Sequence, residues 1–250
     1  MNTAHDLTGH WVRDWIKAPG SEEHTTRVHW LQAETGLYAD MRIPVERPNV
    51  AGFSRLADLP QPALAALLKA EGFAGRIDVV DSVCTWERQI NLHGFPCPVD
   101  AGKMHWGPEG QLFEDGVHAE YREKWRAAPA EPLKASVHKL EDLTVFVVSN
   151  SKIFLVACGA ANMPAQTELQ GQLLAGTAAS AQIAQAFQAC FTYGHWRGAN
   201  GIAGLSTNPL LEGQTVLTRT DDVLTWTHTS FDGARNTYDL LLPSLAKILP

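Results

Sequence analysis

Residues 28–43 read VHWLQAETGLYADMRI, and this stretch decides the fold class. Large side chains alternate with smaller or polar ones on both sides of Gly36, which is the pattern of two β-strands joined by a turn. The same period of two occurs before this stretch, over 10–17, and after it, over 77–92, 103–106, 112–114 and 117–125. The sequence therefore predicts that the first half of the chain consists of antiparallel strands.

Two short helices are expected to interrupt the strands. The segments 62–72 and 178–188 are rich in Ala, Leu and Gln, and Pro62 and Gly72 stand where helices commonly begin and end. Strand patterns continue in the second half over 137–139, 143–148, 153–158, 191–197, 202–206, 215–218, 223–229 and 237–242. So many short strands would curl in one open sheet, which favours closed or nearly closed barrels.

Composition and charge narrow the class of protein further. The chain has 250 residues, 45% of them hydrophobic, and its 27 acidic against 20 basic side chains give a net charge of −7. No basic cluster breaks this balance, so we expect no nucleic-acid partner. Residues 1–7 lack the features of a secretory signal and no apolar run has the length of a membrane helix, so we expect a cytoplasmic protein with no membrane partner. In that compartment Cys84, Cys97, Cys158 and Cys190 are predicted to be free thiols.

A Gly-x-Trp motif stands at Gly9 to Trp11, where the first predicted strand begins. It resembles the signature of the lipocalin, or calycin, superfamily, whose members close antiparallel strands around a ligand cavity. The segments 11–15, 28–32, 39–44 and 84–88 look like those of cytosolic calycin-like proteins whose activity is mostly unassigned. The Thr-Asp-Tyr motif of lipocalins is missing, and the sequence at 237–239 is only a scrambled relative, which argues against a secreted transporter.

The predicted fold is therefore all-β with two short helices, an antiparallel calycin-like β-barrel in two related halves. Charged side chains become scarcer after 127–132, where the sequence AAPAEP indicates a linker. We expect an N-terminal calycin-like barrel over 1–128 and a C-terminal barrel-like half over 133–250.

Charged and aromatic residues share strand faces in the first half. Because residues i and i+2 of a strand point the same way, Trp11, Arg13 and Trp15 are expected to lie on one face. The same spacing recurs in three further strands. The predicted ligand-binding residues are Arg13, Tyr38, Asp40, Arg42, Trp86, Arg88, Tyr121 and Glu123.

If these rings face inward, three guanidinium groups and two carboxylates meet in one interior, where unpaired charges cost several kcal/mol each. In the first interpretation, the excess arginine binds a partly apolar, aromatic acid in the N-terminal barrel. In the second, the protein is an enzyme in which Asp40 or Glu123 is a general acid or base. In the third, the barrels are filled and the protein is an interaction module without a ligand. The sequence leaves these alternatives open, together with the oligomeric state.

A separate catalytic candidate is His195, which shares a strand face with Tyr193 and Arg197. A histidine there could be a general base or a haem ligand, or simply a hydrogen-bonded structural residue. The sequence contains no phosphate-binding glycine loop, no G-x-S-x-G motif and no H-E-x-x-H motif. We therefore predict no cofactor and no metal, and a small molecule as the partner.

Overall fold

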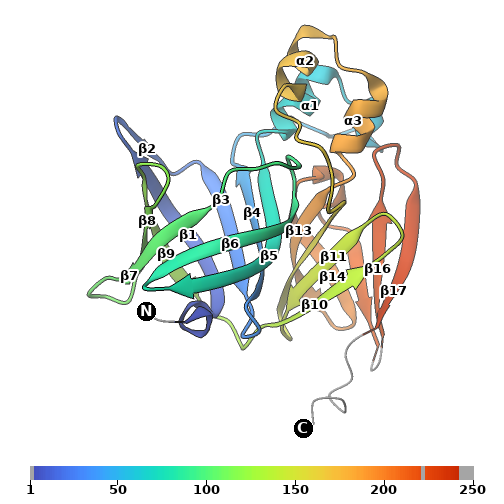
Figure 1. Ribbon diagram of the computed structural model, residues 1–250. Helices are drawn as coiled ribbons and strands as arrows, with labels where there is room; N and C mark the ends of the chain where they lie inside the picture. Colours follow the sequence, from blue (N-terminus) through green and yellow to red (C-terminus); the bar gives the residue numbers. More distant parts are fainter. Residues whose placement is uncertain (1–2, 221–222, 242–250) are drawn as a thin grey trace.

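The computed structural model describes residues 3–220 and 223–241, about half of which lie in two antiparallel β-sheets (Figure 1). The first sheet has the strand order β2-β1-β3-β4-β5-β6-β7-β8-β9. Because β1 also pairs with β9, the strands β1 and β3 to β9 close into a barrel that leaves β2 outside. The bounds are β1 (Gly9–Ala18), β2 (Ser21–Glu23), β3 (Thr26–Gln32), β4 (Leu37–Pro44), β5 (Glu71–Val80), β6 (Val83–Asn91), β7 (Ala101–Trp106), β8 (Leu112–Gly116) and β9 (Arg122–Ala128).

The second sheet runs in sequence order from β10 to β17 and wraps into a nearly closed barrel. Within the described residues its end strands are not paired with each other. The predicted all-β architecture of antiparallel barrels is confirmed, although position 242 of the last predicted strand lies outside the described residues. The bounds are β10 (Lys134–Lys139), β11 (Thr144–Ser149), β12 (Ile153–Gly159), β13 (Cys190–Arg197), β14 (Asn200–Ser206), β15 (Thr215–Arg219), β16 (Val223–Thr229) and β17 (Arg235–Leu241).

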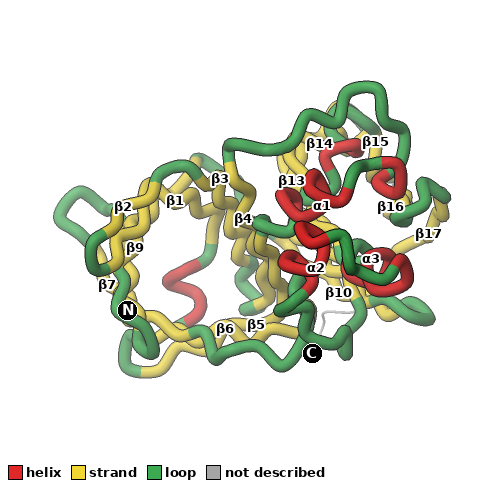
Figure 2. The backbone as a smooth tube through the Cα atoms, turned by 90° about the horizontal axis from the view of Figure 1, so that it is seen from above, coloured by secondary structure: helices red, strands yellow, loops and turns green. Residues whose placement is uncertain are grey.

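Short helices gather at one end of the molecule, above the line where the barrels meet (Figures 1 and 2). They are α1 (Gln61–Leu67), α2 (Leu169–Ala175) and α3 (Ser180–Ala186). Two of them, α1 and α3, overlap the segments where helices are predicted. The sequence did not predict α2. Three short 3-10 helices complete the structure, η1 (Ala4–Leu7), η2 (Leu56–Asp58) and η3 (Pro209–Leu211). Among the described residues, no helix is long and apolar enough to cross a membrane.

The two barrels share one apolar core. The outer faces of β4, β5 and β6 supply residues such as Met41, Ala74 and Ile90, all fully buried. The outer faces of β11, β12 and β13 meet them with residues such as Leu155 and Phe191, which are also fully buried. The walls of both barrels are therefore buried where they touch, and the two interiors lie on either side of this contact (Figure 2).

A β-bulge in β1 changes the expected direction of one tryptophan. The register of β1 against β9 shifts between Arg13 and Trp15, so that Trp15 lies opposite Lys124. Its ring contacts Phe113 at a centroid distance of 6.2 Å, on the outer face of the barrel. The expectation that Trp15 shares the face of Trp11 and Arg13 is wrong, because the bulge inserts one residue into the alternation.

Candidate functional site

Aromatic rings form a buried cluster inside the N-terminal barrel. The fully buried Trp30 ring lies edge-on to Trp86 and to Trp125, at centroid distances of 5.6 Å in both cases. Below them η1 closes the barrel, since its fully buried Leu7 accepts a 2.7 Å hydrogen bond from Trp11 Nε1 through the backbone oxygen. Trp86, one of the predicted ligand-binding residues, is thus part of a packed aromatic core.

Charged side chains occupy the interior above these rings. Arg13 Nη1 donates to Glu123 Oε1 at 2.5 Å, and Arg42 Nη1 lies 3.7 Å from the same oxygen. Arg42 Nε also donates to Asp40 Oδ1 at 3.1 Å. Both carboxylates are about 1% exposed. Strand alternation and pairing therefore bring these four predicted site residues together inside the barrel.

Arg88 lies beside this cluster but has a different ion-pair partner. Its Nη2 donates to Asp100 Oδ2 at 2.6 Å, a carboxylate from the loop between β6 and β7 that sequence reasoning missed. Its guanidinium carbon is 3.8 Å from the centroid of the Phe73 ring, while that of Arg42 is 4.9 Å from the same centroid. Two cations thus share one aromatic ring, an arrangement in which each cation–π contact stabilises the position of a guanidinium group.

Glu114 is the second site residue that sequence reasoning missed. It lies directly opposite Glu123 on adjacent strands and is 2% exposed. Its carboxyl oxygens accept hydrogen bonds from Tyr121 Oη at 2.7 Å and Trp125 Nε1 at 3.1 Å. Burial, with the charge of Glu123 as a further cause, raises the pKa of Glu114 well above its ordinary value. Burial therefore favours the protonated form of Glu114, and Tyr121 holds the carboxyl group in place.

The positive excess expected from the sequence is absent. Asp100 neutralises Arg88, so Asp40, Glu123 and Asp100 balance three guanidinium groups. Burial raises the pKa of Asp40 to about 6, and the Arg42 charge opposes this rise. Tyr38 is fully buried, and its hydroxyl has no hydrogen-bond partner in the described part of the chain. The charges of the three ion-paired carboxylates and the three guanidinium groups thus cancel, and Asp40 gains a proton near pH 6.

A groove of about 250 Å³ opens at this end of the barrel. Arg88, Phe73 and His93 line it from the N-terminal barrel, and Ala165 lines it from the segment that precedes α2. Backbone hydrogen bonds of 2.7 Å from Phe95 to Met163 and of 2.8 Å from Ala165 to Phe95 hold the two walls together. The Nε of Arg88 has no hydrogen-bond partner within residues 3–220 and 223–241. Arg88 and Phe73 therefore border both this groove and the charged interior.

His195 lies apart from this site, exposed on the outer face of β13. Its ring meets Tyr193 edge-on at a centroid distance of 5.2 Å, and Tyr193 stacks on His29 at 4.1 Å. His29 Nδ1 and His10 Nε2 are 3.0 Å apart. Burial lowers the pKa of His10 to about 4 and that of His29 to about 3. His195 therefore belongs to a histidine and tyrosine cluster between the barrels and contacts neither of the carboxylate candidates.

No group of three or more His, Cys, Asp or Glu side chains that could hold a metal ion occurs among the described residues.

The comparisons with known proteins show a shared fold. No family model and no curated protein matches the chain. Among solved structures, an uncharacterised protein of Saccharomyces cerevisiae aligns with a TM-score of 0.52 and 12% sequence identity, over 92% of this chain and 97% of that one. At this identity the similarity extends to the arrangement of the barrels alone. The antiparallel barrels are consistent with a calycin-like protein and compatible with small-molecule binding.

Proposed function

We propose that this protein binds a small, partly apolar acid in the groove at the open end of the N-terminal barrel. The observation that carries the proposal is the Arg88 guanidinium, which lines the groove, lies over the Phe73 ring and has an Nε–H without an acceptor. A guanidinium group has five N–H donors and can bind a second carboxylate beside Asp100. Pro96 and Pro98, which are exposed and line the same groove, offer apolar surface to the remainder of such a ligand.

Charge balance gives the proposal a second, independent consequence. A ligand carboxylate adds one negative charge to an interior in which acidic and basic groups already cancel. Asp40, with a pKa of about 6, is the carboxyl group most able to compensate by taking up a proton. We therefore expect tighter binding at pH 5.5 than at pH 7.5, with uptake of up to one proton.

Titration calorimetry with benzoate and phenylacetate tests this proposal, with benzamide and benzylamine as matched neutral and cationic probes. We expect the acids to bind and the other probes not to bind. Arg88→Met should weaken acid binding by about 10-fold or more, which corresponds to the loss of one charge-assisted hydrogen bond. Arg122→Met is the matched control, because it breaks the exposed Arg122–Asp115 pair on the outside of the same barrel.

Two results would contradict the proposal. If neither acid binds, or if both bind Arg88→Met as well as the wild type, Arg88 has a structural role in its pair with Asp100. The filled barrels then favour an interaction module.

The raised pKa of Asp40 favours one alternative, an enzyme that uses this carboxyl group as a general acid or base. A catalytic pKa near the working pH gives the most effective proton transfer. Asp40 is about 1% exposed and bonded to Arg42, so a substrate must reach it from the groove past Arg88. Loss of a pH-dependent turnover in Asp40→Asn, with acid binding retained, would support this alternative.

A further inference from the structure

Two cysteines face each other at the mouth of the C-terminal barrel. Cys158, near the end of β12, and Cys190, the first residue of β13, are direct cross-strand partners. Antiparallel partners have Cα atoms about 4.5 or 5.5 Å apart, depending on the type of pair. Both spacings fall within the range of about 4.4–6.8 Å that a disulfide bridges. The backbone therefore already holds these two residues at a separation suited to a disulfide.

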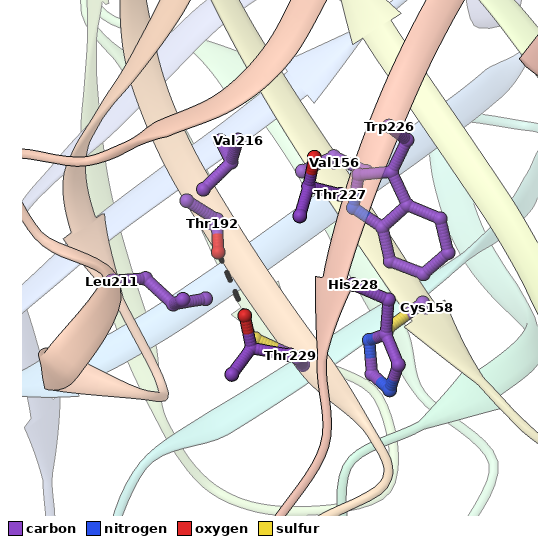
Figure 3. Close-up of a pocket in the computed structure, with 10 residues that line it drawn as sticks. Val156, Cys158, Thr192, Leu211, Val216, Trp226, Thr227, His228 and Thr229 are labelled. Carbon is purple, nitrogen blue, oxygen red and sulfur yellow. Dashed lines mark hydrogen bonds between the residues drawn. The ribbon is translucent and has the colours of Figure 1, made fainter. Parts of the chain in front are cut away.

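Both side chains reach one small cavity inside this barrel, which Figure 3 shows with His228 beside Cys158. The cavity has a volume of about 10 Å³, close to the minimum that holds one water molecule. Cys158 Sγ is 3.9 Å from His228 Nδ1. Cys190 Sγ is 3.7 Å from the hydroxyl oxygens of Thr192 and of Ser206. Two thiols, a histidine and two hydroxyl groups thus lie close together around this small cavity.

The two thiols differ in exposure to solvent, and this difference indicates which of them reacts first with an oxidant. Cys158 is about 1% exposed, whereas Cys190 is partly exposed. Burial raises the pKa of the Cys158 thiol, and the neighbouring Cys190 adds to the rise. Burial lowers the pKa of His228, so its imidazole is neutral, and its Nδ1 lies close enough to Cys158 Sγ to relay a proton to a leaving hydroxide. Cys190 is accordingly the thiol that meets an oxidant first, and Cys158 is the thiol that closes the bond.

We propose that Cys158 and Cys190 are a redox modification site, which forms a reversible disulfide when hydrogen peroxide reaches the partly exposed Cys190 thiol. In the first step Cys190 attacks one peroxide oxygen, giving a sulfenic acid at Cys190 and one water molecule. In the second step Cys158 attacks the Cys190 sulfur and expels hydroxide, while His228 accepts the Cys158 proton and passes it on, so that a second water leaves. Peroxide is reduced by two electrons and the two thiols are oxidised to one disulfide.

The disulfide would join the two ends of the segment between β12 and β13, which carries α2 and α3. This segment, residues 159–189, also contributes Ala165 to the wall of the groove of the N-terminal barrel. A disulfide between the two ends of this segment would fix one wall of that groove relative to β12 and β13. This modification is independent of whether the groove binds an acid.

Peptide mass spectrometry of the whole protein after peroxide treatment tests the site. We expect the intact mass to fall by about 2 Da, a cross-linked peptide joining Cys158 to Cys190, and full recovery with dithiothreitol. Cys84 and Cys97 should remain thiols in that species. Cys190→Ser should form no intramolecular cross-link, and oxidised wild-type protein should have a higher thermal midpoint than the reduced protein, a shift that Cys190→Ser lacks.

His228→Gln separates the two chemical steps. Dimedone, which traps sulfenic acids, should label Cys190 in this variant more than in the wild type, because the second step is slowed and the first is not. Equal disulfide formation in His228→Gln and wild type would overturn the role given to His228. The site itself is refuted if Cys158 and Cys190 both stay reduced while Cys97 oxidises, or if Cys190 oxidises only to sulfinic acid.

Discussion

Replacement of glutamate by glutamine is expected to change the free energy of unfolding differently at Glu114 and at Glu123. They are cross-strand partners, both almost fully buried, yet only Glu123 has arginine partners within 4 Å. Glu123→Gln leaves Arg13 and Arg42 short of a carboxylate inside the barrel. Breaking a buried ion pair from one side costs about 3–5 kcal/mol. Because Arg13 keeps Glu23 at 3.2 Å and Arg42 keeps Asp40, we expect a loss near the lower limit, about 3 kcal/mol.

Glu114→Gln changes little by the same reasoning. A neutral carboxyl group and an amide have similar shape, and the amide can still bond to Tyr121 and Trp125. We expect a change of less than about 1 kcal/mol in the free energy of unfolding at pH 7. Urea unfolding followed by tryptophan fluorescence resolves the two outcomes, because a loss of about 3 kcal/mol shifts the midpoint by roughly 1 M or more.

The pH dependence of the same variants is a second test. The pKa of folded Glu114 is above that of the unfolded chain, so the folded state holds a proton that the unfolded state has released. The stability due to Glu114 is therefore greatest in acid and is lost as the pH rises above about 4.5 towards its folded pKa. Glu114→Gln should remove this slope, so that the variant gains on the wild type at alkaline pH. If Glu114→Gln instead costs as much as Glu123→Gln at pH 7, Glu114 is ionised and the assignment is refuted.

Three further changes test the contacts around the two barrels. Since the folded pKa values of His10 and His29 lie below the ordinary value of 6.5, protein stability should fall as the pH drops from about 6.5 to about 4, and urea titrations of His10→Gln should show a shallower fall. Gly94→Ala places a Cβ 2.3 Å from the Pro164 oxygen at a positive φ of 75°, so it should separate the groove walls and speed amide hydrogen exchange at Phe95. Leu155→Ala removes a fully buried side chain between the barrels and should cost about 2–5 kcal/mol in urea unfolding, and a loss under 1 kcal/mol would contradict the shared core.

Local alternation of the sequence was sufficient to predict most strands and the faces that charged residues share with aromatic ones in β4 and β6. Alternation fails where the backbone changes its period, as at the bulge before Trp15. It also runs without a break through the turn at Asp81 and Ser82, which both adopt positive φ and separate β5 from β6. Neither residue is a glycine, the residue type that most often marks a positive φ.

The ion pairs of the site depend on contacts between distant segments. Arg88 meets Asp100, which lies in a loop where no strand pattern indicates a direction. Glu114 lies in a predicted strand, but its raised pKa depends on burial and on the register that places it opposite Glu123. Pairing across strands and loss of solvent are properties of the folded chain, and for this reason the charge balance could not be obtained from the sequence.

The apolar contact between the barrels limits how this chain can be divided or recombined. Separation of the halves would leave Met41 and Ile90 on one product, and Leu155 and Phe191 on the other, as parts of wide hydrophobic surfaces in water. Each half expressed alone should therefore aggregate, and a chimera that takes one barrel from a distant relative must bring a matching face with it. The two barrels are therefore expected to evolve together, so that a substitution in the contact face of one barrel is compensated in the contact face of the other.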